Sequence, residues 1–148
     1  MSPAPFPRRQ VGTTGRVSWM VGNEEFESVL ALPGIARYEY FVKRAASHGQ
    51  VWGLRGDGGW VVAVDDDGNR HFPVWAHQRF AEACATGPWA GEKPVLIDVD
   101  EWVTGWLPEL EEDGMRVAVF QTPDDEAVGI APARLKEDLE AELEQFEL

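Results

Sequence analysis

The chain has 148 residues, one cysteine and a formal net charge of −13. Its length suits one domain that buries enough apolar surface to fold without a disulfide or a metal. The acidity argues against binding nucleic acid through phosphates, which needs clustered Lys and Arg. No apolar run is long enough for a signal peptide or a membrane span, so we expect a cytoplasmic protein with no membrane partner.

Two helices are predicted near the N-terminus. Residues 1–22 contain clustered Pro, Gly and Thr and are interpreted as a flexible lead-in to a single domain over residues 23–148. Asn23 looks like an N-cap for a helix that extends to Leu32. After Pro33-Gly34 a second helix continues to about Ser47, and its predicted core stripe is Ile35, Tyr38, Val42 and Ala45.

Three short strands follow, at Gln50–Arg55, Trp60–Asp65 and Arg70–Trp75. The turns GDGG and DDDGN favour hairpins, because Gly, Asp and Asn tolerate positive φ. The middle strand is apolar on both faces, which indicates a central strand or one partly covered by a partner. Pro73 lacks a backbone donor, so the third strand is placed at a sheet edge, or the proline near the end of the strand.

The second half alternates helices and strands. We predict a short helix at His77–Cys84, a strand at Val95–Val99 and a helix over Trp102–Leu110 that is bent by Gly105 and Pro108. Strands follow at Met115–Phe120 and Ala127–Ile130. A last helix begins at Pro132, and its core stripe is Leu135, Leu139, Leu143 and Phe146. The fold class is therefore α+β. We expect a mostly antiparallel sheet of five or six strands covered by helices, with a C-terminal acidic amphipathic helix.

The sequence contains no recognised catalytic or cofactor motif. A phosphate loop, a dinucleotide-binding fingerprint and a nucleophile elbow are all missing. The GDGG turn joins two strands instead of opening a helix, so it lacks an anion site. Cys84 falls late in a helix on the apolar stripe, where a buried, unreactive thiol is expected. We predict no catalytic, cofactor-binding or metal-binding residues and no cofactor.

Three polar residues are weak candidates for a pocket: His71, His77 and Asp98. The histidines flank Trp75 and could meet an aspartate of the DDD turn on a metal, although such a site needs three or four ligands. Asp98 lies at a strand-to-helix junction, which suits a catalytic acid or a helix cap, and the cap is favoured. The alternative function is an enzyme or small-ligand binder with a pocket near Trp75, His77 and Asp98–Trp102.

Tryptophan is the most informative residue type. Most indoles are expected in the core, because each buries a large area. A half-exposed subset would anchor an interface, since Trp is enriched in binding hot spots. The candidate interaction surface comprises Trp52, Trp60, Trp75, Trp89, Trp102 and Trp106.

Four segments carry a family resemblance: RYEYFVKRAASHGQVWGLRGDGGWVVAVDDDG, PVWAHQRFAEACATGPW, WLPELEEDGMRVAVFQTP and a closing P-x-x-L-x-x-D-L-E. They resemble a bacterial family of domains of unknown function, number 2750 in that series, roughly from Ile35 to Phe146. This resemblance implies no activity and transfers no catalytic residue. A fainter similarity, at Pro73–Trp75 and Gly114–Val119, is to the N-terminal domain of SseB-type proteins associated with type III secretion. Small acidic α+β domains also occur among toxin immunity proteins.

These observations favour a non-enzymatic protein-interaction module, immunity-like or adaptor-like, that acts through an acidic and aromatic surface. The expected partner is another protein, and a basic one if it recognises the acidity. The sequence leaves a homodimer open. This hypothesis expects an exposed apolar patch of several hundred Å² rimmed by carboxylates.

Overall fold

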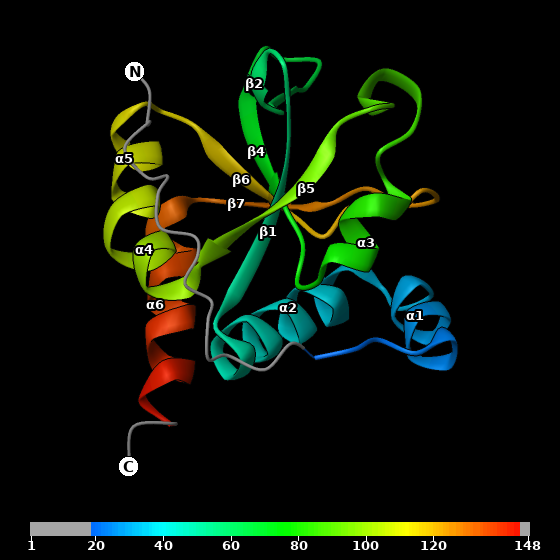
Figure 1. The fold of residues 1–148 in the computed structure, drawn as a ribbon. Coiled ribbons are helices and arrows are strands. Elements are labelled where there is room, and N and C mark those ends of the chain that lie inside the picture. The colour runs from blue at the N-terminus through cyan, green and yellow to red at the C-terminus, as the bar shows by residue number, and fades with distance from the viewer. Residues whose placement is uncertain (1–18, 146–148) are drawn as a thin grey trace.

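A computed structural model describes residues 19–145, and its helices surround two crossing sheets (Figure 1). Residues 1–18, most of the predicted lead-in, and Phe146 lie outside the described residues. The helical elements are α1 (Asn23–Leu30), α2 (Gly34–His48), α3 (Gln78–Ala83), the 3₁₀ turn η2 (Gly87–Trp89), α4 (Val99–Glu101), the π-helical segment η3 (Trp102–Trp106), α5 (Leu107–Glu112) and α6 (Pro132–Glu144). The strands are β1 (Gln50–Gly56), β2 (Gly59–Trp60), β3 (Ala63–Val64), β4 (Arg70–Val74), β5 (Lys93–Asp98), β6 (Arg116–Val119) and β7 (Val128–Ile130).

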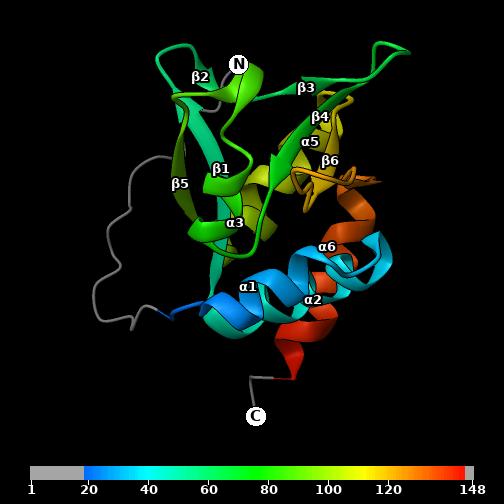
Figure 2. The same ribbon diagram turned by 90° about the vertical axis from the view of Figure 1, so that its right-hand side faces the viewer.

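The strands form two sheets instead of the single sheet that was expected. One sheet has the order β2-β1-β5 and is antiparallel, and the other has the order β3-β4-β6-β7, in which β4 and β6 are parallel. Trp52 and Trp75 link the sheets, because each N–H donates to the carbonyl of the other, at 2.9 and 2.8 Å. The α+β class is confirmed. Figure 2 shows the two sheets splayed apart, with α1 and α2 across the end where they approach each other.

The segment predicted as one strand at Trp60–Asp65 is divided between the two sheets. Gly59 and Trp60 pair with β1, and the Val61 N–H still donates to the Leu54 carbonyl. The chain then leaves β1, and Ala63–Val64 pairs with β4. The prediction of one continuous strand was wrong, because alternation with a period of two shows an extended chain without showing which neighbour it pairs with.

Pro73 lies near the end of β4, which is one of the two predicted alternatives, although β4 is an interior strand of its sheet. The Val74 carbonyl accepts from the Phe120 N–H, so Val74 directs its backbone groups towards β6. Pro73 precedes it and faces the opposite side, where the pairing with β3 reaches only His71. The missing N–H therefore removes no hydrogen bond from the sheet.

One core fills the space between the sheets and the helices. Leu135 and Leu139 of α6 are fully buried against it, as the predicted stripe requires. Ile35 was predicted to belong to the stripe of α2 but is 65% exposed, whereas Arg37 in the same turn is buried, so the first turn of α2 is covered on the Arg37 side and open on the Ile35 side. The predicted bend in the helix after Asp98 corresponds to η3, where a wider turn buries Trp102, Val103 and Trp106 together.

Candidate functional site

The six tryptophans of the candidate surface do not form one surface. Trp75, Trp102 and Trp106 are buried, whereas Trp52, Trp60 and Trp89 are partly buried. Three of the indoles surround the Phe72 ring, and the distances from its centroid are 5.7 Å to Trp60, 5.8 Å to Trp102 and 5.3 Å to Trp106. Trp75, Trp102 and Trp106 are therefore core residues, because the space between the sheets is filled by the largest apolar side chains.

The two candidate histidines lie far apart. His71 is near the start of β4, where its ring contacts Gly129 of β7, and a Cβ added to that glycine would lie 3.3 Å from His71 Nε2. His77 follows the end of β4. The two positions are six residues apart, with the rest of β4 and a bend at Ala76 and His77 between them. Within residues 19–145 no three metal-ligating side chains meet, so the metal site that was considered does not form from these residues.

His77 and Asp98 both cap helices. His77 Nδ1 accepts from the Arg79 N–H at 3.0 Å and begins α3. Asp98 Oδ2 accepts from the N–H groups of Asp100 and Glu101 at 3.0 and 3.4 Å and begins α4. The favoured interpretation of Asp98 as a cap is therefore confirmed. Trp75 and Trp102, which were expected beside a pocket, are fully buried.

Asp98→Ala is expected to lower the free energy of unfolding by about 1 kcal/mol, because two N–H groups in the first turn of α4 lose their acceptor. Urea denaturation followed by circular dichroism measures this change. Asp98→Asn is the control, since an amide oxygen can accept the same bonds and should retain most of the stability. An alanine variant as stable as the wild type would show that solvent replaces the cap.

Cys84 is a buried thiol, as predicted. Its Sγ donates to the Gln121 carbonyl at 3.2 Å. Burial raises the pKa of this thiol to about 11, so the nucleophilic thiolate is not formed near neutral pH.

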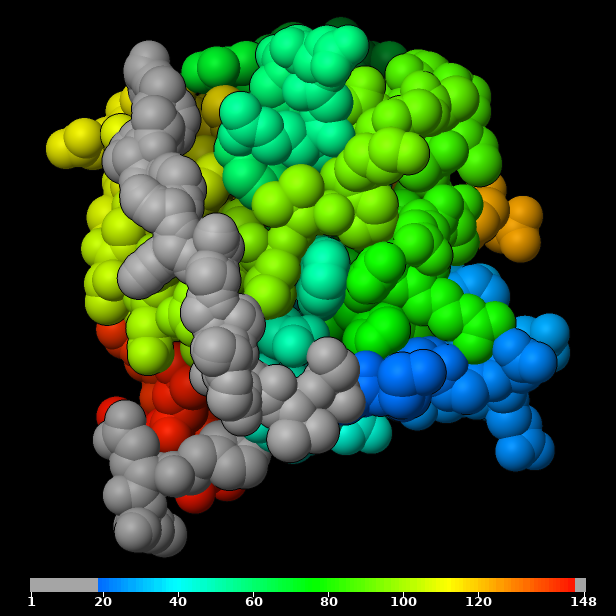
Figure 3. All heavy atoms as spheres, viewed as in Figure 1, coloured from blue at the N-terminus to red at the C-terminus, as the bar shows by residue number. Residues whose placement is uncertain are grey.

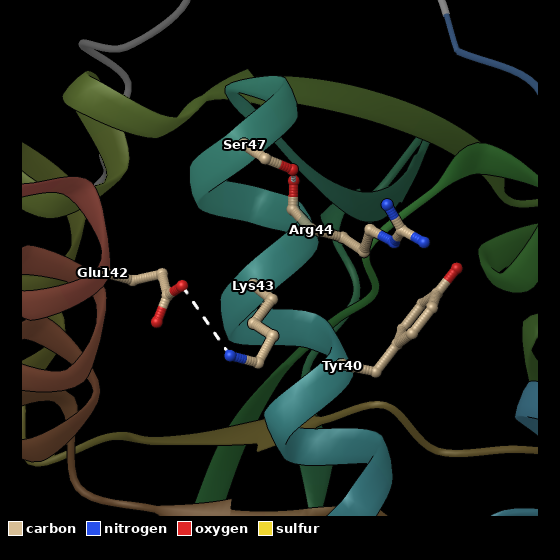
Figure 4. Close-up of a pocket in the computed structure, with 5 residues that line it drawn as sticks. All are labelled: Tyr40, Lys43, Arg44, Ser47 and Glu142. Carbon is tan, nitrogen blue, oxygen red and sulfur yellow. Dashed lines mark hydrogen bonds and ion pairs between the residues drawn. The ribbon is translucent and has the colours of Figure 1, made fainter. Parts of the chain in front are cut away.

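A shallow pocket of about 370 Å³ lies between α2 and α6 (Figure 4). Tyr40, Lys43, Arg44 and Ser47 line it from α2, and Glu142 lines it from α6. Lys43 and Glu142 approach each other to 3.9 Å, whereas Arg44 and Tyr40 point to the other flank of α2 in Figure 4. The polar groups diverge, so the pocket lacks the convergent groups of a specific ligand site. The sequence analysis did not single out these residues.

An exposed apolar pair lies at the edge strand β3, with Val64 in the strand and Val62 just before it. The exposed large apolar side chains among the described residues are Met20 (82%), Ile35 (65%), Val64 (63%) and Val62 (37%). Val62 and Val64 are two residues apart in an extended chain and therefore share one face. β3 ends the order of its sheet, and the β3–β4 hairpin extends away from the helices in Figure 2. The segment from η2 to β5 runs across the face of the molecule seen in Figure 3.

The tip of this hairpin is organised by Asp65. Its Oδ1 accepts from the N–H groups of Asp67 and Asn69, both at 2.9 Å, and its own N–H donates to the Asn69 carbonyl at 3.0 Å. The bond from the Asn69 backbone is the main reason that the pKa of Asp65 lies below its usual range. Three carboxylates, on Asp65, Asp66 and Asp67, thus follow Val64 directly. The apolar pair Val62 and Val64 with these carboxylates is called the β3 edge below.

Comparison with known proteins identifies a family. The profile of the family described as "Protein of unknown function (DUF2750)" matches residues 38–139. The chain belongs to the DUF2750 family. The family resemblance noted in the sequence is confirmed. No curated protein and no solved structure gives a significant match.

The DUF2750 match contains the whole β3 edge, and α1 precedes it. The description of this family gives no activity, so it assigns no role to any residue. None of the helices in residues 19–145 is both long enough and apolar enough to cross a membrane.

Proposed function

We propose that this protein is a non-enzymatic protein-interaction module that binds an extended segment of another protein at the β3 edge. The observation that carries the proposal is an exposed apolar pair, one valine in an edge strand and one just before it, followed at once by three carboxylates. The sequence hypothesis expected an apolar patch of several hundred Å² rimmed by carboxylates. This pair supplies a smaller apolar surface, formed by valines instead of tryptophans.

The backbone of the β3 edge favours addition of a strand. In an antiparallel pair, successive residues direct their N–H and C=O groups to opposite sides. Asp65 faces β4, since its N–H donates to Asn69, and Ala63 pairs with His71 on the same side. The backbone groups of Val64, which lies between these two residues, therefore face outward. A partner strand can use them in the way that peptides add to exposed sheet edges.

The side chains define the chemistry of the partner. Val62 and Val64 favour apolar residues at alternate positions of the added strand. Asp66 and Asp67 are exposed beside them and favour Lys or Arg at the adjoining end. The overall charge of −13 adds long-range attraction for a basic segment. An immunity-like or adaptor-like role in the cytoplasm is the proposed biological context.

The alternative of a pocket near Trp75, His77 and Asp98–Trp102 gains no support. Two of these side chains are fully buried indoles, and His77 and Asp98 are engaged as helix caps. A catalytic or ligand-binding function is therefore not proposed.

A comparison of variants in affinity capture tests the proposed function. The wild-type protein, the double variant Val62→Thr/Val64→Thr and the single variant Ile35→Thr are used to capture proteins from the native cell extract. Threonine keeps the β-branched shape but removes apolar surface. Ile35 is the matched control, because it is 65% exposed on α2, close to the 63% of Val64.

The expected result is a partner that the wild type and Ile35→Thr retain and the double variant loses. A synthetic peptide from that partner should shift the amide resonances of Val62 and Val64. Added salt should weaken the binding of this peptide, because it screens the charges of the aspartates. A partner bound equally by the double variant, or lost from Ile35→Thr alone, would exclude the β3 edge as the binding surface.

A further inference from the structure

Residues 1–18, which precede the described part of the chain, have the composition that the β3 edge favours. They contain three arginines, Arg8, Arg9 and Arg16, and all 26 acidic residues of the chain come after them. The Arg8-Arg9 pair directly follows Pro3–Pro7, in which every second residue is proline and the others are alanine and phenylalanine. An apolar stretch followed at once by two arginines is therefore the counterpart of the apolar pair and the carboxylates at the β3 edge.

The alternating prolines leave backbone donors on one side only. Proline has no N–H, whereas Phe6 and Arg8 keep theirs. Successive residues of a strand direct their backbone groups to opposite sides, so Phe6 and Arg8 share one side while Pro5 and Pro7 face the other. The residue before a proline also favours an extended conformation. The segment Pro5–Arg9, called the donor segment below, can therefore pair with a sheet edge and offers no donor from its prolines to a further strand.

The backbone of the donor segment fits β3 in a parallel register with Pro7 opposite Val64. In a parallel pair, one residue bonds to both neighbours of the residue opposite it. The outward N–H of Val64 can then donate to the Phe6 carbonyl, and the Arg8 N–H can donate to the Val64 carbonyl. The missing N–H of Pro7 faces away from β3, so it removes no bond from this pairing.

The side chains of the donor segment match the β3 edge in the same register. Pro5 then lies opposite Val62, and its ring adds apolar contact. Arg9 lies opposite Asp66, which is exposed. An antiparallel register would carry both arginines away from the carboxylates, because the segment would run in the opposite direction. Charge therefore selects the parallel direction.

A second copy of the chain meets these requirements more easily than the same copy. The Trp19 carbonyl is 2.9 Å from His77 Nε2, and His77 follows the end of β4 that is farther from the β3–β4 hairpin turn. Figure 2 shows this hairpin extending away from α1, which Trp19 precedes. The ten residue steps from Arg9 to Trp19 span at most roughly 35 Å. Within one copy this tether would also have to reverse direction after Arg9, which shortens its reach.

We propose that the donor segment of one copy adds as a parallel strand to the β3 edge of a second copy, so that self-association competes with other partners for this edge. The inference rests on the proposed function, because it uses the same strand-accepting edge. Each copy has one donor segment and one edge, so reciprocal exchange closes at two copies. Physiological salt screens charges farther apart than about 8 Å, which weakens the repulsion between two acidic bodies and preserves the contacts between arginine and aspartate.

Paramagnetic relaxation between copies tests this contact. A nitroxide is attached to Ser2→Cys in protein without isotope label, which is mixed with isotope-labelled protein without nitroxide. Cys84 is buried, so wild-type protein taken through the same labelling reaction is the control for attachment. The amide signals of Val64 and Asp66 should lose intensity in the mixture. The amides of β7, which is the other edge of the same sheet, should keep their intensity.

Charge reversal in the donor segment supplies a matched comparison. The nitroxide-bearing copies carry either Arg9→Glu or the control Arg16→Glu, which makes the same charge change outside the donor segment. Arg9→Glu should abolish most of the signal loss at the β3 edge, because a glutamate would then lie opposite Asp66. Arg16→Glu should retain the signal loss. Both changes precede the described fold and leave its residues as they are.

Four results would overturn the proposal. They are the absence of signal loss at Val64, an equal loss at β7, a loss that Arg9→Glu leaves unchanged, and a loss that appears only when both labels are on the same chain. The proposed function keeps its own test, because affinity capture measures a different partner at the same edge. Failure of the capture comparison alone would remove the proposed partner and leave the contact between copies.

Discussion

Arg37→Met is expected to lower the free energy of unfolding by about 3–5 kcal/mol. Arg37 is only 1% exposed, and its guanidinium joins segments that are far apart in the sequence. It donates to the carbonyls of Leu32, Phe120 and Glu126 at 2.6, 3.0 and 2.9 Å, and to Asp125 Oδ2 at 3.1 Å. Methionine preserves apolar volume but leaves these acceptors without their donor.

The backbone conformation of Phe120 increases the loss of stability expected for Arg37→Met. Phe120 has a φ of 63°, in the left-handed region, and is the sole non-glycine residue with positive φ among residues 19–145. A bulky residue stays in this region only where its surroundings hold it there. The bond from Arg37 to the Phe120 carbonyl is one such constraint, and the Phe120 N–H bond to Val74 is another.

Denaturation by urea measures the Arg37 effect, and Arg134→Met is the control. Arg134 forms an exposed i,i+4 pair with Asp138 at 3.3 Å, which contributes only about 0.5 kcal/mol or less. Similar, small losses of stability in both variants would show that water replaces the Arg37 hydrogen bonds. The total free energy of unfolding of a domain of this size is about 5–15 kcal/mol, so the loss expected for Arg37→Met is a large share of it.

Trp75→Ala is expected to lower the free energy of unfolding by about 3–5 kcal/mol, since it removes a fully buried indole and leaves a cavity. Trp75 also donates its Nε1–H to the Gln121 carbonyl at 2.8 Å and bridges the two sheets through its backbone. Thermal or denaturant unfolding, followed by circular dichroism, provides the measurement.

Trp75→Phe separates packing from hydrogen bonding. Phenylalanine keeps most of the ring volume and loses the donor, while the Gln121 carbonyl retains the Cys84 thiol as a weaker donor. The expected loss is about 1–3 kcal/mol, smaller than that of alanine. A Trp75→Ala variant with an unchanged free energy of unfolding would instead mean that this indole is not part of the core. Trp75 would then again be a candidate for an interface.

Local chemistry explains which parts of the structure could be predicted. The end of α2 at His48, before a Gly49 with φ of 72°, follows from the left-handed conformation that glycine adopts easily. The Asp98 cap and the tight turn at Asp65–Asn69 depend on residues within a few positions of each other. The burial of Cys84 followed from its place on an apolar helical stripe.

The candidate site was only partly visible in the sequence. The apolar character of both faces of Trp60–Asp65 was the signal for the β3 edge, and its interpretation as a strand partly covered by a partner is now a proposal. The sequence did not show which of the six candidate indoles face the interior. The ring of His77 also contacts the Trp19 carbonyl, which is 58 residues away in the sequence.

The sequence by itself determined the helices, the turns and the α+β class, because periodicity and turn residues act over short distances along the chain. The tertiary structure decided the division into two sheets, the parallel pairing of β4 with β6 and the burial of Arg37. Arg37 shows the physical reason. Its acceptors Phe120 and Glu126 are 83 and 89 residues away, and no local pattern specifies contacts between segments so distant in the chain.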